Sequence, residues 1–361
     1  MKNPKKKVFV GVSGGVDSAV SLYLLKKEGY DVTGVFIRTW SPDFIDCTWR
    51  DERRDAMRIC AELGVRFLEC DAEEAYKKGV ADYMIKEYSL GRTPNPDVMC
   101  NREVKFGVFW DFAKAHGADA VATGHYARIS QKSEARNQNN EFQLLRGKDE
   151  SKDQSYFLWT LTKDDLAHTL FPVGELEKKE VRRIADKIGL SNAKKKDSQG
   201  VCFLGPIDLK EFLSHYIKTQ KGDVLSEDGS VIGFHDGAVF FTLGERHGFT
   251  ITKKTSEDAP YYVVGKDVEK NTITVSHEIE KIDEKSDKKI ILKNVVLREE
   301  ISEEKVYDCE IRYHGKKNPC FVKKTNKDLE VCPKDGGIFV APGQSVVIYD
   351  GDVCVGGGIV C

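Results

Sequence analysis

The sequence predicts an α/β protein, a doubly wound parallel sheet followed by a small β domain and a C-terminal β-barrel. Apolar runs alternate with helical patterns in the first half, and short alternating segments separated by Asp-Gly and Gly turns fill the second half. A chain of 361 residues also exceeds one typical domain. We therefore expect units at residues 1–205, 206–280 and 281–361.

A glycine-rich turn joins the first strand to the first helix. Val8 to Val12 is an apolar run typical of a strand buried on both faces. Helical spacing of apolar residues then begins near Val16 and ends at Gly29. The turn between them, Ser13-Gly14-Gly15, lets the backbone aim N–H groups at a ligand beside a helix N-terminus. We expect an anion to bind there.

This turn matches neither of two common phosphate motifs. A Walker A loop needs a lysine after its last glycine, where this chain has Val16-Asp17, and the turn is not G-x-G-x-x-G. An aspartate facing phosphates suggests a bridging Mg²⁺, which takes carboxylate and phosphate oxygens. The alternative is an ordinary strand-to-helix turn with Asp17 as a favourable charge in the first helical turn. The full Ser-Gly-Gly-Val-Asp-Ser string favours the phosphate site.

The next elements continue the alternation of strands and helices. The pattern predicts strands at Val32 to Ile37, Val65 to Cys70 and Ala118 to Thr123, with helices at about Thr48 to Leu63 and Lys178 to Gly189. Ligands bind at the carboxyl ends of such strands. Ile37, Gly124 and His125 are therefore candidates for the rim of a nucleotide site.

Three other segments of the first half are polar or interrupted. Residues 91–102 contain two prolines, so we expect an irregular loop there, a frequent place for functional residues. Ser130 to Gln143 is typical of a hairpin tip or a surface insertion. Lys194 to Gly205 is a basic, glycine-containing loop that holds Cys202.

The second half is predicted to be β structure. Gly222 to His277 has short alternating segments with turns at Asp228-Gly229 and Asp236-Gly237, as in a small β domain. Lys281 to Asp287 is a charged linker. Ile290 to Cys361 alternates again, and we expect it to close the chain as a barrel.

Composition and charge indicate the class of protein. No apolar run approaches a membrane span, and the N-terminus enters a strand without a signal sequence, so we expect a cytoplasmic protein that does not associate with membranes. The net charge of −2 does not announce a nucleic-acid binder, although short lysine runs such as Lys194 to Lys196 could form a basic surface. The ten cysteines include no C-x-x-C pair, so we expect reduced thiols and no structural metal.

Two cysteines, Cys100 and Cys202, fall in predicted loops instead of on apolar faces. A spectator thiol is the ordinary interpretation of one such cysteine. Lys194 to Lys196 lie upstream of Cys202 and would favour its nucleophilic thiolate. Asp97 precedes Cys100 closely enough to act as a local acid or base. These surroundings favour sulfur chemistry beside the nucleotide site.

Several strings resemble the signatures of one enzyme family. They are Thr93-Pro94-Asn95-Pro96-Asp97-Val98-Met99-Cys100-Asn101, Ala122-Thr123-Gly124-His125-Tyr126-Ala127, Lys152-Asp153-Gln154-Ser155-Tyr156-Phe157 and Lys195-Lys196-Asp197-Ser198-Gln199-Gly200-Val201-Cys202-Phe203. They resemble the bacterial tRNA-specific 2-thiouridylases, which replace O2 of the wobble uridine with sulfur. The glycine-rich turn resembles the PP-loop of N-type ATP pyrophosphatases, which split ATP between its α and β phosphates. The resemblance runs from Gly11 to Gln344.

The resemblance implies roles for the matching positions. For binding ATP it implies Gly11, Val12, Ser13, Gly14, Gly15, Val16, Asp17, Ser18, Ile37 and Gly124. For contact with the target base it implies Asn95, Pro96 and Asp97, with Asp97 as general acid or base. For contact with tRNA it implies His125, Lys152, Asp153, Gln154, Arg312, Tyr313 and Gln344.

The same resemblance implies the sulfur route and the partners. Cys202 would carry a persulfide, and Cys100 would release the sulfur by forming a disulfide with it. ATP and Mg²⁺ are the implied cofactors. The tRNAs for Lys, Glu and Gln are the implied substrates, with sulfur from a cysteine desulfurase, a relay protein or free sulfide.

Three alternatives stay open at the level of the sequence. Lysidine, GMP and argininosuccinate synthetases share the phosphate turn, but they do not explain the Pro-Asn-Pro-Asp-Val-Met-Cys string. A nucleotide-sensing RNA-binding module would use the loop cysteines only to report redox state. An iron–sulfur cluster held by Asp97, Cys100 and Cys202 is the third alternative, and the persulfide route is favoured over it.

Overall fold

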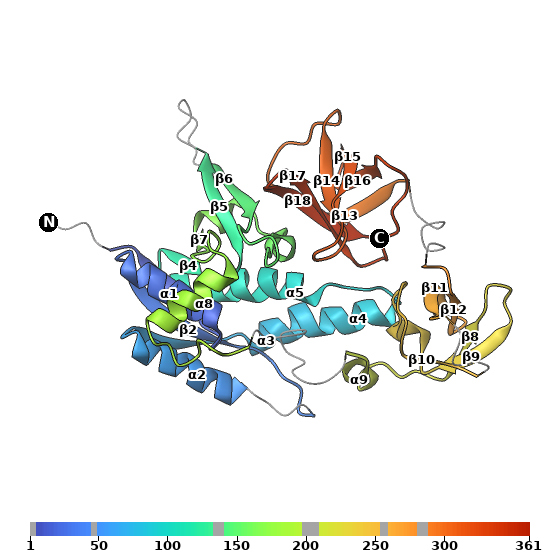
Figure 1. The fold of residues 1–361 in the computed structure, drawn as a ribbon, viewed down its shortest axis with the longest axis horizontal. Helices are drawn as coiled ribbons and strands as arrows, with labels where there is room; N and C mark the ends of the chain where they lie inside the picture. Colours follow the sequence, from blue (N-terminus) through green and yellow to red (C-terminus); the bar gives the residue numbers. More distant parts are fainter. Residues whose placement is uncertain (1–4, 45–48, 133–140, 197–208, 253–258, 280–287) are drawn as a thin grey trace.

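A computed structural model describes residues 5–44, 49–132, 141–196, 209–252, 259–279 and 288–361. They form a parallel-sheet unit, a small β unit and a C-terminal barrel, with long helices running between the first two (Figure 1). The predicted fold class is therefore confirmed. No helix among these residues is long and apolar enough to cross a bilayer.

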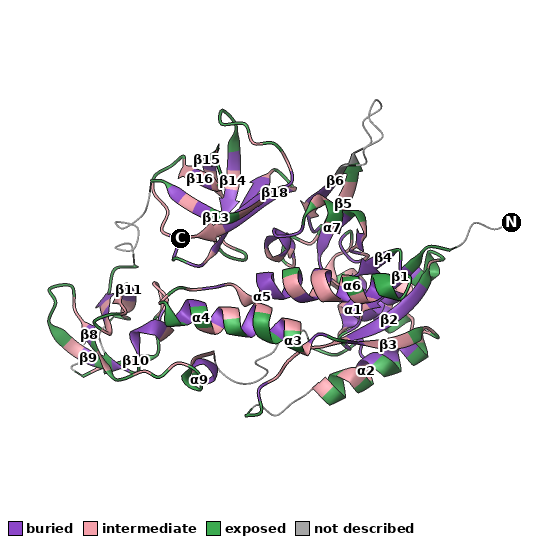
Figure 2. Ribbon diagram, turned by 180° about the vertical axis from the view of Figure 1, so that it is seen from behind, coloured by how far each residue is buried: buried purple, intermediate pink, exposed green. Residues whose placement is uncertain are grey.

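The first unit is a parallel sheet with strand order β3-β2-β1-β4-β7. Its strands are β1 (Lys7–Gly11), β2 (Asp31–Arg38), β3 (Arg66–Asp71), β4 (Ala120–Ala122) and β7 (Thr169–Leu170). Successive residues of β1 face opposite sides, because Val8 and Val10 join one apolar cluster and Phe9 joins another. The sheet is thus buried on both faces, as the apolar run predicted (Figure 2).

Helices cover both faces of this sheet. The Val8 and Val10 face packs against α1 (Val16–Lys27), α2 (Trp49–Glu62) and α8 (Lys178–Lys187). The Phe9 face packs against two long helical stretches. One comprises α3 (Glu73–Tyr76), η1 (Lys77–Asp82) and α4 (Tyr83–Ser89), and the other comprises α5 (Pro96–Met99), η2 (Cys100–Val108) and α6 (Phe109–Ala115).

The prediction of an irregular loop over residues 91–102 was wrong for its second half. Helix α5 begins at Pro96, and the Asn95 side chain caps it by accepting from the Val98 amide at 3.3 Å. Proline is tolerated at the first helical position because its missing N–H has no partner there anyway. Cys100, which we placed in a loop, is consequently in a helical stretch and only 3% exposed.

The polar stretch around residue 135 was predicted to be a hairpin tip. The flanking strands β5 (Ala127–Lys132) and β6 (Glu141–Arg146) pair antiparallel, which confirms the hairpin. Strand β6 also pairs with the barrel through Leu145 and Val353. The chain then forms η3 (Ser155–Leu158) and α7 (Lys163–Ala167) before it enters β7.

The small β unit has strand order β10-β9-β8-β12-β11. Its elements are α9 (Leu209–Ser214), β8 (Gly222–Leu225), β9 (Val231–His235), η4 (Ala238–Phe240), β10 (Phe249–Ile251), β11 (Tyr262–Asp267) and β12 (Thr272–Ser276). Its own apolar cluster centres on Val224, Phe241 and Ile273. This core explains why the short alternating segments fold as a separate layer of strands.

The C-terminal unit is a closed barrel. Its strands are β13 (Ile290–Leu297), β14 (Val306–Glu310), β15 (Asn318–Thr325), β16 (Asp328–Pro333), β17 (Ser345–Asp350) and β18 (Val353–Val360). Pairing of β13 with both β16 and β18 closes the ring, which leaves no free edge between them. Cys309 and Cys320 are fully buried inside it, as small hydrophobic residues.

A buried ionic cluster fixes the barrel to the parallel-sheet unit. Arg146 at the end of β6 is paired with Asp153 at 3.1 Å and with Glu310 of β14 at 2.6 Å. Its guanidinium carbon lies 3.5 Å from the centre of the Tyr349 ring. All of these side chains are buried, so each charge depends on its partners.

We expect Glu310→Gln to lower the free energy of unfolding by about 3 kcal/mol, because it leaves the buried Arg146 undercompensated. Glu303→Gln is the matched control on the same barrel, since Glu303 and its partner Lys323 are largely exposed and such pairs contribute roughly 0–1 kcal/mol. Urea unfolding followed by tryptophan fluorescence measures both. Equal losses would contradict a stabilising role for the buried cluster.

Candidate functional site

The glycine-rich turn forms a compact loop between β1 and α1. Its Ser13 amide donates to Ser18 Oγ at 3.4 Å, and that hydroxyl donates to the Gly15 carbonyl at 3.1 Å. Gly14 has φ = +72°, which favours glycine. The buried Asn192 side chain donates to the Gly14 carbonyl at 3.1 Å. The turn is thus held in one shape beside the N-terminus of a helix, as an anion site requires.

The other residues predicted to bind the nucleotide lie around this turn. A Cβ on Gly124 would be 2.7 Å from the Ser18 amide nitrogen, so the chain after β4 touches the start of α1 directly. A Cβ on Gly11 would be 3.4 Å from Ile37 Cδ1. The carboxyl ends of β1, β2 and β4 therefore bring these predicted residues to one edge of the sheet.

Asp17, in the first turn of α1, is engaged by two other side chains. Tyr126 donates its hydroxyl to Asp17 Oδ1 at 2.7 Å. Lys178, the first residue of α8, places Nζ 2.7 Å from each carboxylate oxygen. Asp17 therefore joins three segments of the first unit at the edge where the phosphates are predicted.

Tyr126 also connects this edge to the Lys152 to Phe157 segment. Its amide donates to Gln154 Oε1 at 3.0 Å, and the Gln154 amide donates back to the Tyr126 carbonyl at 2.8 Å. Asp153 is buried and accepts from the Gly147 and Ser155 amides at 2.9 and 3.0 Å. The predicted tRNA segment is therefore built rigidly onto the nucleotide edge.

The same segment holds the start of α5. The Asn95 side chain is hydrogen-bonded to the Tyr156 phenol oxygen, and that phenol donates to the Ser345 carbonyl of the barrel at 3.0 Å. Asn101 donates to the Phe157 carbonyl at 3.0 Å. Pro96 and Asp97 occupy the first turn of α5, one helical turn before the buried Cys100. The predicted base-contact residues thus lie beside Cys100 on one short helical stretch.

All three units meet at Thr93. Its amide donates to the Pro342 carbonyl of the barrel at 2.8 Å, and its hydroxyl lies 3.2 Å from that of Thr242 in the small β unit. The half-buried Gln344 follows directly after Pro342 and Gly343. The approach to Asn95 is therefore shaped by all three units.

Two of the predicted tRNA contacts, Arg312 and Tyr313, are exposed on the barrel. The Tyr313 ring lies 4.5 Å from that of Phe157, next to the partly exposed Lys152 and Gln154. His125 differs from them because it is buried against Phe106 and Phe171, with Nδ1 2.7 Å from Thr123 Oγ1. Burial, aided by the charge of Lys105, lowers the pKa of His125 well below its ordinary value.

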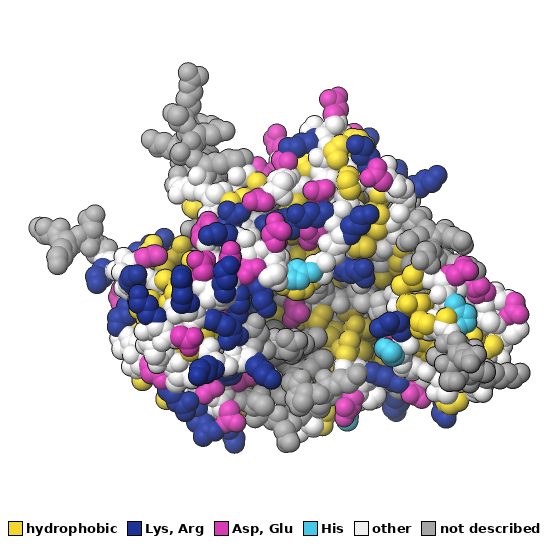
Figure 3. All heavy atoms as spheres, viewed as in Figure 1, with side chains coloured by type: hydrophobic (Ala, Val, Ile, Leu, Met, Phe, Trp, Pro, Cys, Tyr) yellow, Lys and Arg dark blue, Asp and Glu magenta, His cyan; other side chains and the backbone are white. Residues whose placement is uncertain are grey.

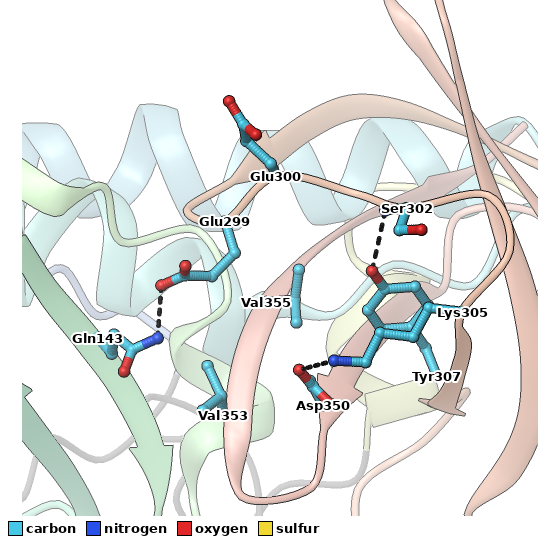
Figure 4. A pocket seen from close by; sticks show the side chains of 9 residues that line it. All are labelled: Gln143, Glu299, Glu300, Ser302, Lys305, Tyr307, Asp350, Val353 and Val355. Atoms are coloured by element: carbon cyan, nitrogen blue, oxygen red, sulfur yellow. Dashed lines mark hydrogen bonds and ion pairs between the residues drawn. The ribbon is translucent and has the colours of Figure 1, made fainter.

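Cys202 lies outside the described residues. The lysine run that leads to it is described, and Lys195 pairs with Asp55 of α2 at 2.8 Å. A separate hollow of about 350 Å³ lies between β6 and the barrel, where Gln143 faces Glu299 and Lys305 faces Asp350 (Figure 4). It contains none of the predicted site residues.

The sequence analysis missed two residues of this edge, Tyr126 and Lys178. Tyr126 was noted only as part of a motif. Lys178 was noted only as the start of an amphipathic helix. The capping pattern Glu177 to Glu180, in which each carboxylate caps the first turn, was the signal that would have fixed Lys178 at the helix start.

Comparisons with known proteins cover the whole chain. Residues 6–206, 210–277 and 287–360 match the family models tRNA methyl transferase HUP domain, tRNA methyl transferase PRC-barrel domain and aminomethyltransferase beta-barrel domain. The chain is 43% identical to the tRNA-specific 2-thiouridylase MnmA of Halalkalibacterium halodurans, over 99% of this chain and 96% of that one. It is 43% identical to the protein of that name from Idiomarina loihiensis, over 100% and 97%. A 4-thiouridine synthetase–RNA complex with bound ATP is 19% identical, covering 56% of this chain and 45% of that one, with a TM-score of 0.35.

We expect Gly124→Ala to weaken ATP binding, because its Cβ would push on the Asp17 and Ser18 backbone. Overpacking of this kind costs about 1–3 kcal/mol. Calorimetric titration with ATP measures the loss. Gly117→Ala is the control, since a Cβ there meets nothing within 4 Å and only the positive φ is strained. Equal ATP affinity of the Gly124→Ala variant and the wild type would contradict the placement of the phosphates.

The buried His125 predicts a pH dependence of stability. The unfolded chain takes up a proton at His125 near its ordinary pKa of about 6.5, whereas the folded protein resists this proton. The free energy of unfolding should therefore fall as the pH drops below that value, by up to about 1.4 kcal/mol per pH unit from this residue. His125→Gln should flatten the fall between about pH 6.5 and 5 in urea titrations. An unchanged slope would contradict a neutral buried imidazole.

Proposed function

Because the chain belongs to the family of tRNA-specific 2-thiouridylases, we propose that it is an ATP-dependent sulfurtransferase that replaces O2 of the wobble uridine, position 34, with sulfur. The observation that carries this proposal is the hydrogen-bonded path from Asp17 through Tyr126 and Gln154, continued along the chain to Tyr156 and its bond with Asn95. This path keeps the phosphate turn and the predicted base-contact residues in one framework.

The glycine-rich turn fits the phosphates of ATP. The close approach of Gly124 and the positive φ of Gly14 leave the amides at the start of α1 uncovered by neighbouring side-chain carbons. We propose that residues 11–18, Ile37 and Gly124 bind the nucleotide. The uridine O2 then attacks the α-phosphorus, the bond from that phosphorus to the bridging oxygen breaks, and pyrophosphate leaves with the electron pair. O2 becomes part of AMP, a good leaving group.

Sulfur transfer then follows at C2 of the activated base. The terminal sulfur of a persulfide on Cys202 attacks C2, and AMP leaves with the original oxygen. The Cys100 thiolate attacks the Cys202 sulfur, which leaves the outer sulfur on the base and joins the two cysteines in a disulfide. An external thiol must reduce this disulfide before the next turnover. We propose Asp97 as the acid or base, next to the base-contact residues Asn95 and Pro96.

Mg²⁺ is proposed only as part of the Mg-ATP substrate. We predicted Asp17 as its bridge to the protein, yet both Asp17 oxygens accept hydrogen bonds from Lys178, and one also accepts from Tyr126. Among the described residues, no group of three or more His, Cys, Asp or Glu side chains is arranged to hold a metal. The Asp17 carboxylate therefore does not fit a direct Mg²⁺ ligand in this arrangement.

The proposed macromolecular substrate is tRNA for Lys, Glu or Gln. Lys and Arg side chains gather over the parallel-sheet unit (Figure 3), among them the exposed Arg183, Lys187, Lys194 and Lys196. Phosphate contacts of this type position RNA without reading its bases. We propose Lys152, Gln154, Arg312, Tyr313 and Gln344 as direct contacts. His125 and Asp153 are buried, so we propose that they act by shaping the adjacent backbone.

The remaining proposals concern organisation and supply. We propose a cytoplasmic enzyme with a catalytic unit at residues 1–205, a small β unit at 206–280 and a tRNA-contacting barrel at 281–361. A cysteine desulfurase or a sulfur-relay protein is the proposed donor. The persulfide on Cys202 requires such a donor because neither ATP nor tRNA carries sulfane sulfur.

The names of two matching family models suggest methyl transfer as a second candidate. Methyl transfer needs no phosphate turn, whereas adenylation of O2 does. The two reactions change the mass of the nucleoside differently, so mass spectrometry of digested tRNA distinguishes them. An iron–sulfur route would colour the anaerobic protein, and a colourless active enzyme excludes it. A nucleotide-sensing module would bind ATP without releasing pyrophosphate when tRNA is added.

We expect purified protein with Mg-ATP and a sulfur source to thiolate a tRNA-Glu transcript, detected by retardation on a mercury-containing gel. Cys100→Ser and Cys202→Ser should each abolish the retarded band, because one cysteine delivers the sulfur and the other releases it. Cys361→Ser, at the exposed C-terminus, is the matched control and should retain activity. Turnover by either active-cysteine variant would contradict the two-cysteine route.

A further inference from the structure

Lys178 occupies an unusual place for a lysine. It is the first residue of α8, following the cap residue Glu177. The helix dipole disfavours a cation in this first turn. Its neighbour Lys179 is in the same turn, but its side chain is 80% exposed and pairs with Glu177. The Lys178 side chain is only 12% exposed, so little water screens its charge.

Asp17 and Tyr126 hold the Lys178 ammonium at the start of α1. Nζ is 2.7 Å from both oxygens of Asp17, and it lies 5.7 Å from the centre of the Tyr126 ring. The Tyr126 hydroxyl donates to Asp17 Oδ1, which fixes the carboxylate from the other side. Asp149 accepts from the Lys178 backbone amide at 2.8 Å and anchors the first turn of α8. Three segments distant in sequence thus define the position of one cation.

The phosphate turn itself supplies no cation. Asp17 is the ionisable residue of the Ser13 to Ser18 turn, and its negative charge alone would repel a triphosphate. Pairing with Lys178 neutralises that charge and places ammonium donors at the same edge. Lysine binds phosphates as a point charge. The position of Lys178 therefore supplies from a distant helix what a Walker A lysine supplies from within its own loop.

We propose that Lys178 is the cation that binds the ATP phosphates and that Asp17 and Tyr126 are its positioning residues, in place of a Mg²⁺ ligand role for Asp17. This inference rests on the proposed function insofar as the phosphates are those of ATP. As the bond between the α-phosphorus and the bridging oxygen breaks, negative charge grows on the departing pyrophosphate. A fixed ammonium stabilises that charge without transferring a proton.

The test measures equilibrium binding of α,β-methylene ATP to the full chain without tRNA, by calorimetry at several Mg²⁺ concentrations. Lys178→Met should weaken binding about 10- to 100-fold, the usual effect of losing a hydrogen bond to a charged group. Lys178→Arg should restore part of the affinity because it keeps the charge. Lys179→Met is the matched control on the same turn and should bind as the wild type does. Wild-type affinity of Lys178→Met would overturn the proposal.

Asp17→Asn and Tyr126→Phe separate positioning from metal binding. Both should weaken analogue binding less than Lys178→Met does, and neither should change the Mg²⁺ concentration needed for half-maximal binding. An Asp17→Asn variant that needs more Mg²⁺, while Lys178→Met does not, would overturn the proposal. Thermal melting of each variant verifies folding. Because the readout uses no tRNA and no sulfur, a failed thiolation assay would leave this result independent.

Discussion

The pairing of Tyr126 with Gln154 is the interaction on which the rest of the site depends. Each backbone amide of the pair is satisfied by the other residue, one through a side-chain oxygen and one through a carbonyl. The Tyr126 hydroxyl then reaches Asp17 at the phosphate turn. Two residues after Gln154, Tyr156 meets Asn95. A displacement of this pair would therefore shift the phosphate edge and the start of α5 together.

Buried polar contacts, more than apolar area, set how the barrel sits against the parallel-sheet unit. Arg146 joins Asp153 to Glu310, and the Tyr156 hydroxyl reaches the Ser345 carbonyl. Such contacts are directional, and a buried ion that loses its partner is costly, so few alternative placements of the barrel satisfy them. Thr93 adds the small β unit to the same junction. The geometry around Asn95 is thereby a property of the whole chain.

The sequence was a good guide where local rules suffice. The apolar runs and the Ser13 to Gly15 turn predicted the sheet and its phosphate edge because strand burial and glycine geometry act locally. The two prolines were misread, since Pro96 starts a helix once Asn95 caps it. The burial of His125 and Asp153 could not be predicted, because it depends on Phe171 and Arg146, which other segments bring to them.

Lys178 shows why part of a site escapes sequence reading. A lysine at the first residue of α8 opposes the helix dipole, so its local electrostatics are unfavourable. Asp17 compensates for this only after α1 and α8 pack on the same face of the sheet. Neither residue alone indicates a cation at the phosphate turn. A local rule that is broken and then compensated across the fold is typical of functional positions. The phosphate site is therefore completed by folding of the sheet, and not by its loop alone.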